Sequence, residues 1–102
     1  MDLGKLRDLV SHNRFEWRKH ILLRLAVRNI AQRVIIEAIM RGDVIEDYSH
    51  DRPFPSCLML AWVGGKLYHV VVSLDDGNEI AYIITAYEPT LEKFHPDFRT
   101  RR

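Results

Sequence analysis

The sequence predicts an α+β domain of two layers, in which N-terminal helices pack on an antiparallel β-meander. Two observations support this fold class. Apolar residues recur at helical spacing up to about Arg41, and from Gly42 onward they alternate with the period of two that is typical of strands. Glycine-containing turns then separate three short apolar runs. We expect residues 1–102 to form a single domain, because this length suits one hydrophobic core.

The N-terminal third is predicted to be helical. A first short helix, ending near His12, is indicated by apolar residues three and four positions apart: Leu3, Leu6, Leu9 and Val10. The stretch 14–19 alternates aromatic and polar residues, so it is either a short strand or the lead into the next helix. Residues 20–41 then follow a helical pattern, with a possible break at Asn29. Gly42 stands where a C-cap glycine is expected.

The remaining residues are predicted to form strands. An extended segment covers 44–48, and two prolines make 50–55 a loop. Three strands follow at 56–63, 67–74 and 80–87, joined by hairpin turns at Gly64-Gly65 and at 75–78. After them, the four-residue spacing of Phe94 and Phe98 is compatible with one short helical turn, although Pro96 lies between them.

The net charge of +1 hides an uneven distribution. Residues 1–41 carry nine basic and four acidic residues, a net charge of +5, whereas 42–98 sum to −7 and the last four residues to +3. These basic regions are either ordinary solvated helix faces or, if the chain ends converge, a surface that binds a polyanion.

His20, Arg24 and Arg28 lie four residues apart, so on one helix they share a face. A row of cations without an intervening acid calls for negative charge opposite it. Acids of the same chain, such as Glu46 or Asp47, are one source. A nucleic-acid phosphate is the other, and arginine suits it well.

Two further residues are candidates for chemistry. His69 lies inside a predicted strand, as either a structural hydrogen-bonding group or a proton-transfer group. Tyr87 ends the last strand, where it is either a rim aromatic or a group that stacks on a base or moves a proton. An even-length turn at 75–78 would place the two residues on opposite faces, and a bulge would place them on the same face. The sequence leaves both possibilities open.

Other classes of site are not indicated. The five histidines form no close metal-ligand pair, and Cys57 is the only cysteine, which excludes an internal disulfide and a cysteine-based zinc cage. No phosphate loop or dinucleotide fingerprint is present. Neither a metal nor a nucleotide cofactor is therefore expected. No apolar run approaches the roughly 20 residues of a membrane span, and the charged N-terminus is unlike a signal peptide. The expected location is the cytoplasm.

Several segments resemble a bacterial and archaeal family known as domain of unknown function 4258. The resemblance rests on 42–48, 51–58, His69-Val-Val-Val, Ile84-Thr-Ala-Tyr-Glu-Pro and the closing Phe98-Arg99 with two further arginines, and more thinly on His20, Arg24, Arg28 and Ile30. The chain departs from the family pattern at three positions. Asn29 replaces a usual glycine, Ala31 replaces a common Ser or Thr, and Phe94 replaces a frequent tryptophan.

Members of this family look like relatives of the RelE and BrnT toxins, small ribonucleases with helices before an antiparallel sheet. The resemblance implies the toxin of a type II toxin–antitoxin system. Such a toxin would be a metal-independent endoribonuclease that cleaves RNA by 2′-hydroxyl attack. Its partner would be an antitoxin, and the resemblance suggests a zinc-finger protein of the MqsA (YgiT) type. In this scheme His69 and Tyr87 transfer protons, Arg24 and Arg28 stabilise charge, and His20, Arg99 and Arg102 bind phosphate. The alternative is a non-catalytic module that binds a partner protein or nucleic acid.

Overall fold

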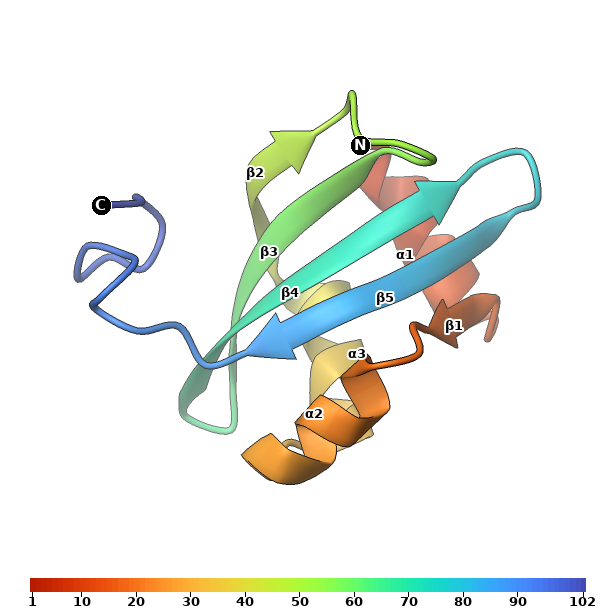
Figure 1. Cartoon of the computed structure of the whole chain (residues 1–102). Helices are drawn as coiled ribbons and strands as arrows, with labels where there is room; N and C mark the ends of the chain where they lie inside the picture. The colour runs from red at the N-terminus through yellow and green to blue at the C-terminus, as the bar shows by residue number, and fades with distance from the viewer.

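The computed structural model describes residues 1–102 and contains three helices and one five-stranded sheet (Figure 1). The elements, in chain order, are α1 (Leu3–Ser11), β1 (Phe15–Trp17), α2 (Ile21–Arg28), α3 (Gln32–Arg41), β2 (Asp43–Tyr48), β3 (Ser56–Val63), β4 (Lys66–Asp75) and β5 (Ile80–Tyr87). The strand order is β1-β5-β4-β3-β2. The predicted α+β class, with N-terminal helices and a sheet, is confirmed.

The sheet is larger than the predicted meander. β2, β3, β4 and β5 pair antiparallel in succession, but β1 adds to the far edge of β5 in parallel. The segment at 14–19 is therefore a strand before it leads into α2, and the sheet is mixed. Parallel pairing is possible because α2, α3 and three strands separate β1 from β5 along the chain.

The helical region divides at Asn29. This residue adopts a left-handed conformation with φ of 56°, and its backbone N–H donates to the Ala26 carbonyl. Asparagine tolerates this conformation better than most residues, so it ends α2 without a glycine. α3 begins after Ala31, which provides no side-chain cap. None of the three helices is long and apolar enough to cross a membrane.

The core lies between the helices and one face of the sheet. Every second residue of the central strands points to this side, because side chains alternate along a strand. The fully buried members from the strands include Cys57, Met59, Val70, Val72 and Ile83, and they meet Leu6, Ile21, Leu25, Ile35 and Ile39 from the helices.

Part of the opposite face, around His69, is covered by the C-terminal segment, residues 88–102, here called the tail. Figure 1 shows this segment leaving β5 and turning back toward β2. Phe94 is its apolar anchor, with only 1% of its surface exposed. The helical turn compatible with the spacing of Phe94 and Phe98 does not form. The tail instead forms turns closed by a bridge between Phe94 and Arg101, since Pro96 has no N–H to donate to a helix.

The acidic strand β2 holds both chain ends. Asp43 pairs with Arg99 at 2.7 Å, Glu46 pairs with Arg101 at 2.9 Å, and Asp47 pairs with the N-terminal amine at 2.9 Å. The acids of β2 and the basic last four residues therefore neutralise each other in space. Single pairs of this kind contribute little, and only the two that involve Arg99 and Arg101 hold the tail against β2.

Gly42 ends α3 for a different reason than the predicted cap. Its backbone is extended rather than left-handed, and a Cβ at this position would meet the carbonyl oxygens of Ala38 at 2.6 Å and Leu60 at 2.8 Å. The glycine is needed because α3 and β3 approach so closely there.

Gly42→Ala should therefore destabilise the protein by about 2 kcal/mol or more, since neither backbone carbonyl has room to move. Gly4→Ala is the matched control: it lies in α1 with space around it, and should leave stability unchanged or raise it by up to about 1 kcal/mol. Urea unfolding followed by circular dichroism measures both. Equal stability of the two variants would contradict the close-contact explanation.

Candidate functional site

A register shift brings His69 and Tyr87 together. Val72 pairs with Ile83, but Val71 pairs with Thr85, so Ile84 is an extra residue in β5. Beyond this bulge His69 lies directly opposite Tyr87. Without the bulge Ala86 would face His69, and Tyr87 would point toward the helices. The bulged alternative left open by the sequence is therefore the one adopted.

His69 is completely buried beneath the tail. Its Nε2 lies 2.7 Å from the Phe98 carbonyl oxygen, and its Nδ1 lies 3.4 Å from the Tyr87 hydroxyl. A carbonyl can only accept, so Nε2 carries the hydrogen and Nδ1 accepts from Tyr87. Phe94 packs edge-on against the ring at 4.5 Å. Burial lowers the pKa of His69, which keeps the imidazole neutral near pH 7.

Tyr87 connects His69 to a cavity of about 500 Å³, here called the arginine cavity. Arg24 and Arg28 of α2 line one side of it, and Phe94 and Arg101 of the tail line another. The Arg28 guanidinium is held in place by a 2.7 Å hydrogen bond to the Ala86 carbonyl. Burial raises the pKa of Tyr87, so its phenol stays protonated at neutral pH.

The two arginines that α2 contributes to this cavity, Arg24 and Arg28, have no acidic partner. Neither Arg24 nor Arg28 takes part in an ion pair, although Glu88 and Glu92 also lie on the cavity wall. Glu46 and Asp47, which the sequence offered as partners, are paired with Arg101 and the N-terminal amine instead. The acids of β2 are therefore not the missing negative charge.

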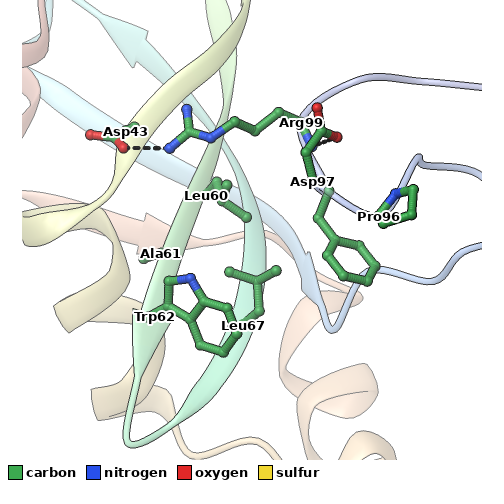
Figure 2. A pocket seen from close by; sticks show the side chains of 9 residues that line it. Asp43, Leu60, Ala61, Trp62, Leu67, Pro96, Asp97 and Arg99 are labelled. Carbon is green, nitrogen blue, oxygen red and sulfur yellow. Dashed lines mark hydrogen bonds and ion pairs between the residues drawn. The ribbon is translucent and has the colours of Figure 1, made fainter.

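His20 lies next to the arginine cavity, whereas Arg99 and Arg102 do not. His20 lines a neighbouring groove that shares Arg24 with the cavity. Arg99 pairs with Asp43 at the rim of a separate pocket of about 350 Å³ on the tail side (Figure 2). Arg102 donates to the carbonyls of Leu91 and Phe94, and so closes the tail on itself.

Two residues of the site were missed at the sequence level. Arg101 lines the arginine cavity, while its guanidinium bonds Glu46 and lies 5.0 Å above the Phe94 ring. Phe94 is the wall between that cavity and His69. One signal in the sequence could have indicated Arg101. Residues 43–47 contain three acids and no basic residue, so basic residues from another part of the chain are expected to pair with them.

The remaining reactive groups do not form a site. No three His, Cys, Asp or Glu side chains come close enough together to hold a metal ion. Cys57 is buried in the core, and burial raises its pKa to about 11, so it remains an unreactive thiol at neutral pH.

The burial of His69 predicts a pH dependence of stability. The unfolded chain protonates this histidine near pH 6.5, whereas the folded protein resists protonation. The unfolded state then binds more protons below pH 6.5, so stability falls as the pH decreases through that value. His69→Gln removes the titrating group, and should lose less stability than the wild type between pH 7.5 and pH 5.5. Thermal unfolding at both pH values measures this, and identical losses would refute it.

The chain matches the model of a known protein family. The model of DUF4258, a domain of unknown function, matches residues 17–88, from the end of β1 to just beyond β5. The matched part includes Arg24, Arg28, His69 and Tyr87, but neither α1 nor the tail beyond Glu88. No curated protein and no solved structure matches the chain. Since the match covers well over half of its length, the chain belongs to the DUF4258 family.

Proposed function

We propose that this protein is a metal-independent endoribonuclease of the toxin type. One observation carries the proposal: a tyrosine hydrogen-bonded to a buried neutral histidine lines a cavity with two arginines that have no acidic partner. Metal-free RNA cleavage needs these groups, namely a proton-transfer group and cations beside the phosphate. The resemblance to RelE and BrnT toxins points to the same chemistry.

The proton path runs through Tyr87 to His69. Tyr87 accepts the proton of the RNA 2′-hydroxyl while its own phenolic proton passes to Nδ1 of His69. The Phe98 carbonyl accepts from Nε2 of the resulting imidazolium, as the third member of a triad does. The 3.4 Å separation between Tyr87 and His69 is long for a hydrogen bond, and proton transfer requires it to shorten when substrate binds. His69 thus acts behind Tyr87 and does not touch the RNA.

The bond changes balance without a metal. The 2′-oxygen attacks the adjacent phosphorus, and the bond from phosphorus to the 5′-oxygen breaks. The proton held on Nδ1 of His69 returns through Tyr87 to that leaving oxygen. The products are a 2′,3′-cyclic phosphate and a 5′-hydroxyl. Arg24 and Arg28 bind the non-bridging oxygens, whose negative charge increases in the transition state. His20 and Arg101, at the two sides of Arg24 and Arg28, extend this basic surface.

Removing the phenolic hydroxyl should abolish most of the activity. We expect Tyr87→Phe to slow cleavage of a labelled single-stranded RNA by about 10²-fold or more in the presence of EDTA, because the proton path is cut. Arg24→Gln and Arg28→Gln should each lower the rate about as strongly, through lost charge stabilisation. Arg33→Gln is the matched control, an exposed arginine on α3 outside the cavity, and should keep wild-type activity.

The failure of this proposal is easy to recognise. A well-folded wild-type protein, verified by circular dichroism, that leaves defined RNAs intact and causes no growth arrest on expression would contradict it. If wild type cleaves RNA and Tyr87→Phe cleaves it equally fast, the protein is a ribonuclease but the proton path through Tyr87 is wrong.

A non-catalytic RNA- or protein-binding module is the second candidate function. It is favoured by the complete burial of His69 under the tail, which gives this histidine a structural role in holding Phe94 and Phe98. A binding module should retain RNA in a salt-sensitive way without turnover. Charge reversal at Arg24 and Arg28 would then abolish binding, whereas Tyr87→Phe would not affect it.

For the partner, we propose an antitoxin protein whose acidic amphipathic helix covers α2. Leu23 and Val27 are 69% and 80% exposed, one helical turn apart, and Arg24 and Arg28 follow each of them directly. A helix with apolar and acidic faces complements this pattern of apolar and basic rows. A zinc-finger protein of the MqsA (YgiT) type is the partner that the family resemblance implies.

Leu23→Glu should therefore weaken binding to a co-expressed antitoxin while leaving RNA cleavage unchanged, because Leu23 lies outside the arginine cavity. Leu91→Glu is the control, the same change at an exposed leucine on the tail. Co-purification and the rate of RNA cleavage are the two measurements. Loss of the complex in both variants, or in neither, would contradict this docking surface.

A further inference from the structure

We propose that the site extends along α2 to a subsite at Arg18, where one unpaired nucleobase of the substrate stacks, so that the substrate is single-stranded RNA. This inference rests on the proposed function, because it names the substrate class of the same site. It assigns a role to Arg18, Tyr82 and Phe54, which the proton path and the phosphate contacts do not use.

The first observation is that the basic surface is continuous. Beside the arginine cavity lies a second groove of about 500 Å³, here called the α2 groove, and the two share Arg24 and Thr85. Arg18, Lys19, His20 and Ile84 line the rest of the α2 groove. A polyanion seated on Arg24 can therefore continue past His20 to Arg18 without leaving basic surface.

The second observation is a stack of flat groups at the end of this groove. The Arg18 guanidinium carbon lies 4.2 Å from the centre of the Tyr82 ring. The Tyr82 ring in turn stacks on Phe54, with centroids 5.6 Å apart and planes inclined by 20°. The Arg18 backbone N–H is fixed to the Ile83 carbonyl at 2.9 Å, so the start of this side chain is anchored to β5.

The third observation is that Arg18 has no other partner. Its side chain is exposed and forms no ion pair, while Tyr82 covers one face of its guanidinium. Arginine planes and aromatic rings are the groups on which proteins stack splayed-out RNA bases. The free face of Arg18 suits such a base, and its charge suits the phosphate beside it.

The spacing fits a base that is not next to the scissile phosphate. Tyr82 and Tyr87 pair with Ser73 and His69, which are four residues apart on β4, about 13 Å along an extended strand. The stacked base then belongs to a nucleotide further along the strand than the cleaved bond. A base paired within a duplex keeps both faces covered by its neighbours, so only single-stranded RNA can use the subsite.

The test separates the flat face of Arg18 from its charge. Arg18→Lys keeps the charge and loses the planar group, and Arg33→Lys makes the same chemical change on an exposed part of α3. Binding of a fluorescein-labelled RNA octamer is measured by anisotropy for wild type and both variants. We expect Arg18→Lys to weaken binding about tenfold, the loss typical of one stacked base, and Arg33→Lys to have no effect.

A series of octamers with an abasic nucleotide at each position in turn locates the base. One position should weaken binding to the wild type about tenfold and cause no further loss in Arg18→Lys, since both changes remove the same contact. A duplex of the same sequence should bind wild type and Arg18→Lys equally.

Three outcomes would overturn the subsite. Arg18→Lys binds RNA as tightly as wild type, or Arg18→Lys and Arg33→Lys lose the same affinity. In the third outcome, every abasic octamer loses as much affinity in Arg18→Lys as in wild type. A polyglutamate peptide that competes with RNA, and whose binding Arg18→Lys weakens as much as it weakens RNA binding, would also overturn it in favour of a protein ligand. Failure of the subsite is distinct from failure of the ribonuclease. If the protein cleaves RNA and Arg18→Lys binds RNA with unchanged affinity, only the subsite is refuted. If RNA binding depends on Arg18 but no RNA is cleaved, only the catalytic proposal is refuted.

Discussion

The arrangement of the candidate site depends on the pairing between β4 and β5 beyond the bulge at Ile84. Side chains alternate along a strand, so this one extra residue decides which face Tyr87 occupies. With the bulge, Tyr87 meets His69 and lines the arginine cavity formed with α2. The same face then needs a cover for the buried imidazole, and Phe94 and the Phe98 carbonyl provide it. The register of the sheet thus places Tyr87 beside His69, and the tail, held to β2 by its arginines, closes over both.

Much of the fold can be predicted from local patterns in the sequence. The change from helical to strand periodicity at Gly42, the Gly64-Gly65 hairpin and the break at Asn29 are each local signals, and the structure contains all three features. β1 and the tail are different. A three-residue strand has too few residues to show a period, and the tail is held by pairs such as Arg101 with Glu46, which are 55 residues apart. No local pattern encodes such a distant contact.

The same distinction applies to the candidate site. Arg24 and Arg28 share a helix, so their common face is predictable from their spacing, and they do line one cavity. His69 and Tyr87 belong to different strands, and their meeting depends on a bulge that no glycine or proline near Ile84 announces. Arg99 and Arg102 are basic residues of a basic tail, but Asp43 and the tail's own carbonyls occupy them. Charge alone could not separate these roles, because each role depends on where the tail crosses the sheet.

The two outer strands of the sheet have a consequence for the behaviour of the protein in concentrated solution. An open strand edge is a template on which a second chain can add, and long flat apolar edges therefore promote aggregation. β1 offers an edge of only three residues, with Glu16 at its centre. At the other edge β2 is interrupted by an irregularity between Val44 and Glu46, and it carries three carboxylates that are already engaged. Beyond Ile83 the edge of β5 has no strand partner, and the Arg28 guanidinium occupies the Ala86 carbonyl there. The mostly apolar strands β3 and β4 lie inside the sheet, and the edges that remain open are short or carry charged groups, so they are poor templates for a second chain.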